Sequence, residues 1–287
     1  MLINRDRKRA KGVVTDVQYG EILSSPIAIR DGDYPDLGGA SVVMITAGVN
    51  EKAGGATDRS DPLGRFRLLK ANTAIFQDIV PKIHNAAPDA LILVVTDPPD
   101  PLAEVVPALG HERVLSTGTY LDSLRFRFHL ARRLNVSARD VEAMVLGEHG
   151  TSEVFLWSSA RVGGRKVVDL FAEDASNSEK LYEELENEVR YANITIIEGI
   201  GASQYGIGMV SARITEVVLR DERAVIPIGC YNPKFGVTLS LPSVVGREGV
   251  LRMLEPEMSD AERKALQRGA DAIRAASSHL DLKAPLQ

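Results

Sequence analysis

The chain has 287 residues, enough for one or two domains, and its 44% hydrophobic and 25% charged residues are typical of a globular protein. The formal net charge of −5 gives no electrostatic reason to expect a nucleic acid or an anionic membrane as a partner. The one cysteine, Cys230, cannot form an internal disulfide, so we expect a cytoplasmic protein.

Short apolar runs alternate with helical patterns in the first half of the chain. The predicted elements are a strand at 41–46, a helix at 63–85, a strand at 90–96, a helix from about 102 and a strand at 113–115. Continuous apolar strands that alternate with helices indicate a parallel sheet covered on both faces. Ligands bind beyond the carboxyl ends of such strands, which here lie near Thr46, Thr96 and Ser116.

The second half mixes strands and helices differently. The predicted elements are a helix at 120–134, strands at 141–146 and 154–161, helices at 179–200 and 210–220, an antiparallel pair at 224–228 and 237–241, and a final helix reaching about 278. A capping box, Ser259 with Glu262, opens that final helix. We therefore predict an α/β first part and a mixed α+β second part that begins near residue 117.

Two motifs carry candidate catalytic groups. Asp122 and Arg125 are three residues apart, so on a helix they share a face, which taken alone indicates an ordinary ion pair. His149 lies between glycines in Gly-Glu-His-Gly, after an apolar strand, where glycine permits close approach of a substrate. A lone histidine is usually structural. His149, however, occurs together with Asp122, Arg125 and a sheet of the nucleotide-binding type, and this combination favours a catalytic role.

These motifs belong to a longer series. The stretches are 46–50, 95–98, 117–127, 147–150, 154–164, 197–199 and 205–208. In sequence and order they resemble the lactate/malate dehydrogenase family over essentially the whole chain. The resemblance implies a partial Rossmann fold, a doubly wound parallel sheet that binds a dinucleotide, at 1–116. An α+β substrate domain would follow at 117–287. It also implies an NAD-dependent oxidoreductase for small 2-hydroxy and 2-oxo acids that is a homodimer or homotetramer.

The resemblance gives each residue of the two motifs a role. His149 would be the acid–base catalyst, since an imidazole titrates near neutral pH. Asp122 would accept a hydrogen bond from the other ring nitrogen and fix the tautomer. Arg125 would bind the substrate carboxylate with its planar fork of N–H groups.

A further arginine of the family lies on a mobile loop and polarises the substrate carbonyl. The stretch 65–72 matches the family segment directly after that loop, so Arg65 takes this role, with Arg59 and Arg67 as alternatives. The loop at 51–64 is longer than the family pattern and is either a hinged lid or a surface insertion without a role. Ser203 is a further candidate for substrate binding.

The cofactor-binding candidates that the resemblance supplies are Asn4, Arg9, Tyr34, Gly48, Val49, Val95, Thr96, Asp97 and Thr117. Asn4 replaces the acidic residue that binds the adenosine ribose, and Arg5 beside it would tolerate a 2′-phosphate. The cofactor is therefore NAD, with NADP left open. No metal ion is expected.

Two side chains depart from the family at the substrate. Asp97 replaces an asparagine that donates a hydrogen bond to the substrate carbonyl, and an ionised aspartate can only accept one. Asp97 therefore needs a proton or a neutralising arginine; otherwise the activity is altered or lost. Glu51 falls where the family selects the substrate side chain, and it would repel a second carboxylate. It favours pyruvate and (S)-lactate over oxaloacetate and malate, while a cationic or hydroxylated substrate is an alternative.

The sequence has no Gly-x-Gly-x-x-Gly, the loop with which the family cradles the pyrophosphate. The chain begins at what resembles the second strand, 2–4. Since the first strand is central in a doubly wound sheet, its loss would split the sheet and leave two apolar edges unpaired. We expect that roughly 30 residues are missing at the N-terminus, the size of a strand, loop and helix.

The sequence is compatible with three functions. The leading one is an NAD-dependent dehydrogenase of the lactate type. The second is a malate-type or otherwise altered 2-oxo-acid reductase. The third is a non-catalytic relative, which Asp97 and the missing glycine loop favour, and which the intact set of His149, Asp122 and Arg125 opposes.

Overall fold

The computed structural model describes residues 1–23, 27–61, 63–174, 178–278 and 280, so Pro62 of the predicted loop and the end of the chain after 280 lie outside the described residues. The helices are α1 (Arg7–Gly20), α2 (Leu69–Ala86), α3 (Pro99–Ala108), α4 (Tyr120–Leu134), α5 (Val167–Asp174), α6 (Ser178–Arg190), α7 (Ala192–Ile200), α8 (Tyr205–Leu219) and α9 (Asp260–Ser277). Short 3₁₀ turns are η1 (Glu21–Leu23), η2 (Tyr34–Leu37), η3 (Gly64–Leu68) and η4 (Ala138–Asp140). The strands are β1 (Val42–Ile45), β2 (Leu91–Val94), β3 (Val114–Ser116), β4 (Val141–Glu142), β5 (Val145–Leu146), β6 (Val154–Phe155), β7 (Arg161–Val162), β8 (Arg165–Lys166), β9 (Ala224–Asn232), β10 (Val237–Gly246) and β11 (Gly249–Met253).

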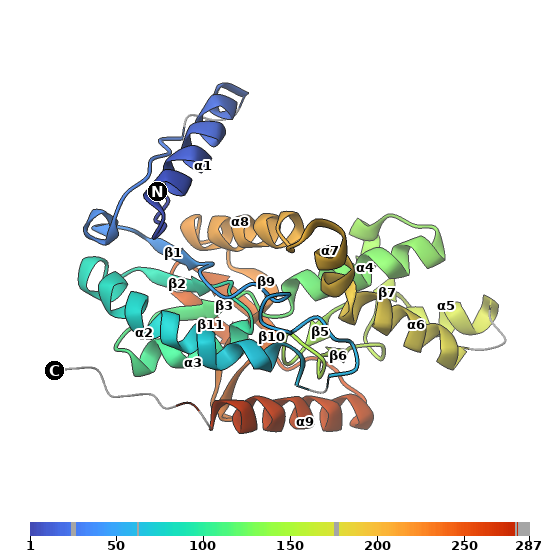
Figure 1. Cartoon of the computed structure of the whole chain (residues 1–287). Coiled ribbons are helices and arrows are strands. Elements are labelled where there is room, and N and C mark those ends of the chain that lie inside the picture. Colours follow the sequence, from blue (N-terminus) through green and yellow to red (C-terminus); the bar gives the residue numbers. More distant parts are fainter. Residues whose placement is uncertain (24–26, 62, 175–177, 279, 281–287) are drawn as a thin grey trace.

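In the described part of the chain, six strands form the main sheet, in the order β1-β2-β3-β9-β10-β11 (Figure 1). β1, β2 and β3 are parallel, as the alternation of apolar strands and helices predicted. The predicted antiparallel pair is confirmed as β9 and β10, both longer than expected. Ser116 of β3 pairs with Gly229 of β9, so the antiparallel strands extend the parallel sheet instead of forming a separate one.

Helices cover both faces of the parallel strands. Successive side chains of a strand point to opposite faces, and all of β2 is buried. Ile92 and Val94 pack with α2 and α3 on one face. Leu91 and Leu93 pack with α8 on the other, which explains why β2 is a continuous apolar run. None of the described helices is long and apolar enough to cross a lipid bilayer.

Several predicted elements of the second half are interrupted. The predicted strand 141–146 is two strands because β4 pairs with β7 whereas β5 pairs with β6, and the strand 154–161 divides in the same way. The predicted helix 179–200 breaks at Tyr191, whose ψ of 9° leaves helical geometry, into α6 and α7.

The predicted capping box at the start of α9 is confirmed. Ser259 Oγ accepts a hydrogen bond from the amide of Glu262, and the Glu262 carboxylate accepts one from the amide of Ser259. Glu262 also accepts hydrogen bonds from the amide and hydroxyl of Ser158, after β6. A cap of this kind stabilises a helix by about 1 kcal/mol, and here it also ties α9 to the segment that follows β6.

The N-terminal segment does not join the main sheet. In the described residues, Leu2 pairs with Asp31 in a single parallel bridge where a strand at 2–4 was predicted, and α1 projects away from the body (Figure 1). β1 has one strand neighbour in the described chain, β2. A cavity of about 620 Å³ separates the two parts, with 1–3 on one side and 42–47 on the other. The predicted split of the sheet is confirmed.

We expect the backbone amides of β1 to exchange with deuterium faster than those of β2. β2 is paired on both sides and fully buried, whereas β1 has a free edge and its Met44 is 46% exposed. Hydrogen exchange followed by mass spectrometry of overlapping peptides measures the difference, with β11, the edge strand at the far end, as the reference. Equal protection of β1 and β2 would contradict the free edge.

Candidate active site

A cavity of about 720 Å³ opens at the carboxyl ends of β1, β2 and β3, where the parallel sheet predicted a ligand site. The predicted site residues that line it are Arg9, Gly48, Val49, Glu51, Val95, Thr96, Asp97, Thr117, Arg125, His149 and Ser203. Asn193 lines it as well and was not predicted. Asn193 lies in the first turn of α7, directly after the break at Tyr191. No local sequence signal marked that break, so this residue was missed.

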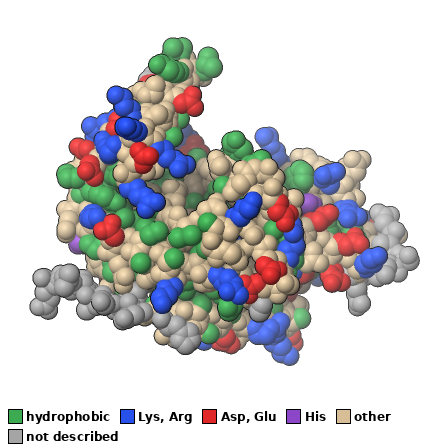
Figure 2. Space-filling view, in the orientation of Figure 1, with side chains coloured by type: hydrophobic (Ala, Val, Ile, Leu, Met, Phe, Trp, Pro, Cys, Tyr) green, Lys and Arg blue, Asp and Glu red, His purple; other side chains and the backbone are tan. Residues whose placement is uncertain are grey.

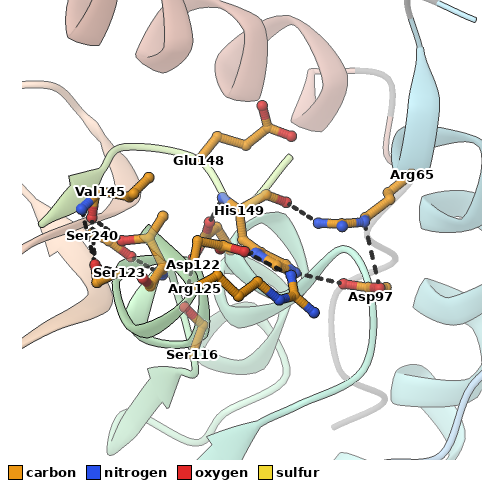
Figure 3. A network of polar contacts seen from close by, with 12 residues as sticks. Arg65, Asp97, Ser116, Asp122, Ser123, Arg125, Val145, Glu148, His149 and Ser240 are labelled. Carbon is orange, nitrogen blue, oxygen red and sulfur yellow. Dashed lines mark hydrogen bonds and ion pairs between the residues drawn. The ribbon is translucent and has the colours of Figure 1, made fainter. Parts of the chain in front are cut away.

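Asp122 holds the two main functional side chains in place (Figure 3). One carboxylate oxygen is hydrogen-bonded to Nδ1 of His149, and the other accepts from Nη1 of Arg125 at 2.9 Å. Burial alone would raise the pKa of Asp122, but the charges of His149 and Arg125 bring that pKa well below its usual range. Asp122 is therefore ionised, and it orients both partners toward the cavity.

The backbone around His149 is fixed on two sides. The His149 amide donates to Asp100 Oδ2 at 2.8 Å, and the His149 carbonyl accepts from Arg65 Nη1 at 3.1 Å. Asp100 is itself held by the hydroxyl of Ser116, which donates at 2.5 Å. Gly147, two residues before His149, has a φ of +85°, a backbone conformation that favours glycine. Asp100 was not predicted as a site residue. The prolines on both sides of it mark the start of a helix, but they do not indicate its contact with His149.

Arg65 is the loop arginine that reaches the site. It is 8% exposed, and its Nε lies 3.7 Å from Oδ2 of Asp97. Burial lowers the pKa of Arg65, but Asp97 and other nearby acids raise it above its ordinary value, so Arg65 is a cation. The two alternatives lie elsewhere, because Arg59 pairs with Glu198 of α7 and Arg67 pairs with Asp61.

Asp97 and Glu51 face each other in the cavity. Asp97 Oδ1 lies 3.7 Å from Nε2 of His149, so the aspartate sits where the reacting carbonyl is expected. The Glu51 carboxyl is hydrogen-bonded to that of Asp97, and burial, then the charge of Asp97, raise the pKa of Glu51. Two acids thus share the part of the cavity in which the family has an asparagine.

The residues at the strand ends fit the nicotinamide half of a dinucleotide. A Cβ on Gly48 would collide with Cγ2 of Thr96, so only glycine leaves this wall free of a side chain. Asn72 joins the two loops: its Oδ1 accepts from the amide of Val49 at 2.8 Å, and its Nδ2 donates to the carbonyl of Asp97 at 2.6 Å. The result is a rigid floor for a flat ring.

The adenosine half is less complete. Arg9 lines the main cavity, but Asn4 and Tyr34 do not. The Asn4 side chain accepts from the amide of Asp6, and Tyr34 lines the second cavity with Lys82 Nζ 5.4 Å from its ring. Since the sequence has no Gly-x-Gly-x-x-Gly, the chain supplies no such cradle for a pyrophosphate.

Asp122, His149 and Glu153 bring possible metal-ligand atoms within 4.8 Å of one another. Two of these groups are already joined by the hydrogen bond between Asp122 and His149, and the positive charges of Arg65 and Arg125 disfavour a metal cation here. Burial, then the charge of Asp122, raise the pKa of Glu153 well above its usual value. We therefore interpret the cluster as proton-transfer machinery.

Two family models match the chain. The lactate/malate dehydrogenase NAD binding domain matches residues 1–114, and the lactate/malate dehydrogenase alpha/beta C-terminal domain matches residues 119–279. The chain belongs to the lactate/malate dehydrogenase family. Its predicted α/β fold with a Rossmann-type sheet is confirmed, and so is the predicted class, an NAD-dependent oxidoreductase.

Relatives in this family are similar over nearly their whole length. The L-lactate dehydrogenase of Chloroherpeton thalassium is 40% identical over 282 residues, covering 97% of this chain and 90% of the relative. The L-lactate dehydrogenase of Thermus aquaticus is 40% identical over 291 residues, covering 98% of this chain and 90% of the relative. The solved minor L-lactate dehydrogenase of Enterococcus mundtii is 30% identical with a TM-score of 0.87, covering 98% and 90%. A lactate dehydrogenase from a deep-sea metagenome library is 31% identical with a TM-score of 0.86, covering 96% and 88%.

Asp100 makes stability depend on pH. Burial raises its pKa from 3.8 to about 7, so between these pH values the folded protein binds a proton that the unfolded chain has released. This contribution to stability is complete below pH 3.8 and is lost as the pH rises through 7. Asp100→Asn keeps the shape and removes the titration. From pH 4 to pH 8, we expect the wild-type free energy of unfolding to fall relative to the variant by up to about 4 kcal/mol.

Urea unfolding at a series of pH values measures this difference. Asp89→Asn, at an exposed aspartate, is the matched control for the loss of one carboxylate. A difference between wild type and Asp100→Asn that stays constant over the range would show that Asp100 does not titrate there.

Proposed function

We propose that the chain reduces pyruvate to (S)-lactate and catalyses the reverse reaction, with NAD as the hydride carrier. The observation that carries this proposal is the fixed pair of His149 and Arg125, both held by Asp122 on one wall of the main cavity. The names of the relatives, L-lactate dehydrogenases at 40% identity, support the same substrate.

Arg125 would bind the substrate carboxylate. One of its guanidinium nitrogens is committed to Asp122, and the side chain lines the cavity. Its other N–H groups can donate in parallel to a carboxylate, a geometry that lysine cannot offer. The 2-oxo acid would then lie with its carbonyl between Arg65 and His149.

His149 would move the proton. Asp122 keeps Nδ1 engaged, so Nε2 is the nitrogen that donates to the carbonyl oxygen during reduction and accepts the proton during oxidation. Arg65 would stabilise the negative charge that develops on that oxygen. NADH, when bound, supplies the hydride. Residues 1–116 would hold the cofactor and 117–287 would hold the substrate, with Ser203 and Asn193 beside it.

We also propose a cytoplasmic homodimer or homotetramer. Figure 2 shows hydrophobic side chains at the outer tip of the projecting N-terminal segment. Tyr19, Ile22 and Leu23 there are 78%, 90% and 92% exposed. Such a group of apolar side chains on one projecting segment favours contact with another subunit.

His149→Gln should lower kcat for pyruvate reduction by about 10²–10⁴-fold, because the variant has no group that can transfer the proton. NADH oxidation followed by absorbance measures the rate. His129→Gln is the matched control, since His129 pairs with Glu188 outside the cavity. A loss smaller than tenfold in His149→Gln would exclude His149 as the acid–base catalyst.

Glu51 should make the enzyme prefer pyruvate to oxaloacetate, since an acid at this position offers no positive charge to a second substrate carboxylate. Glu51→Arg should shift the ratio of kcat/KM toward oxaloacetate by about 10²–10³-fold, because the new arginine adds a charged hydrogen bond to that carboxylate. Steady-state rates with both substrates test this, and Lys52→Arg, at the exposed next residue, is the control. A wild-type preference for oxaloacetate would reject the lactate-type assignment and favour the malate type.

A further inference from the structure

Two carboxyl groups in the main cavity are in contact. Glu51 follows β1 and Asp97 follows β2, and the two side chains are hydrogen-bonded to each other. A carboxylate can only accept hydrogen bonds, so such a contact requires a proton on one of the pair. Both residues line the 720 Å³ cavity that also exposes Arg125 and His149.

The charges around the pair do not neutralise both acids. In the described part of the chain, Arg65 is the arginine within ion-pair distance of Asp97, at 3.7 Å. Arg125 is committed to Asp122. The other charged or titratable groups that face this region are Arg9 of α1, Asp100 of α3, Asp122 of α4, and Glu148, His149 and Glu153 after β5.

We propose that Glu51 and Asp97 share one proton in the working enzyme, and that this proton is what lets an anionic 2-oxo acid bind next to Asp97. The proposal rests on the function proposed above and names a feature of the same site. With one shared proton, Arg65 balances the acid pair and Arg125 balances Asp122. The substrate carboxylate is then balanced by protonated His149.

Without that proton the cavity holds an extra negative charge, and a substrate carboxylate would enter against it. The burial that raises the pKa of Glu51 also makes such a charge more costly than in water. The shared proton is not consumed: reduction takes a hydride from NADH and a proton from His149, and gives NAD⁺ and the 2-hydroxy acid. The acid pair therefore acts on substrate binding, and its loss should change KM more than kcat.

The dependence of pyruvate reduction on pH tests the proposal. As the pH rises, the wild-type enzyme loses the shared proton in addition to any other proton that reduction requires, so log(kcat/KM) should fall with a limiting slope that is steeper than in a variant without the acid pair. Asp97→Asn and Glu51→Gln keep the shapes but remove the shared proton, so the limiting slope of each should be less steep than that of the wild type by about 1. At pH 8, Asp97→Asn should exceed the wild type in kcat/KM by about tenfold or more.

A second measurement needs neither cofactor nor turnover. Infrared spectra of the free protein at pH 7 should contain the C=O band of a protonated carboxyl that each single variant lacks. Buried Asp100 and Glu153 contribute equally to all three proteins and cancel in the difference spectra. Asp78→Asn, at an exposed residue of α2 paired with Lys82, is the control and should match the wild type in both measurements.

The same limiting slope in the wild type and both variants, or the same carboxyl band in all three proteins, overturns the proposal. Thermal unfolding of each variant checks that the fold is retained. If the carboxyl band is present but no protein reduces any 2-oxo acid at any pH, the function proposed above fails while the shared proton stands. The two ideas can therefore fail separately.

Discussion

The whole site depends on one buried carboxylate, that of Asp122. A buried charge is tolerated when its partners satisfy it, and removing one partner of such a group typically costs several kcal/mol. Asp122 uses one oxygen for His149 and the other for Arg125, so the proposed proton donor and the proposed substrate anchor are fixed by the same carboxylate. Asp122 is therefore held by both partners, and replacing it would disturb both side chains at once.

β10, from the antiparallel half of the sheet, sets where that carboxylate meets the histidine. The buried hydroxyl of Ser240 accepts a hydrogen bond from the amide of Thr119, directly before α4. The backbone of Ser240 pairs in both directions with Gly147, two residues before His149. One residue of β10 thus positions the start of the helix that carries Asp122 and the loop that carries His149. The extension of the parallel sheet by β9 and β10 therefore helps to place Asp122 next to His149.

The sequence was most informative where the physics is local. Buried strands such as β2 are short apolar runs, and the capping box of α9 is readable from Ser259 and Glu262 alone. His149 and Asp122 could be named because their motifs lie next to predicted strand and helix ends. The joining of β9 to β3 could not be predicted, since strand pairing is decided by packing between distant segments. The role of Asp100 was hidden for the same reason: its partners, Ser116 and the amide of His149, are brought to it by the fold.

The long loop after β1 is held unevenly along its length. Arg65, directly after the loop, is fixed by the carbonyl of His149 and by Asp97, so the proposed carbonyl-polarising arginine is held in place by the protein itself. The middle of the loop is held by Arg59, which forms exposed hydrogen bonds of 2.9 and 3.0 Å to Glu198 of α7. An exposed ion pair contributes only about 0–1 kcal/mol. The loop is thus anchored strongly at Arg65 and weakly at Arg59, so its middle can move while the charges beside His149 stay fixed.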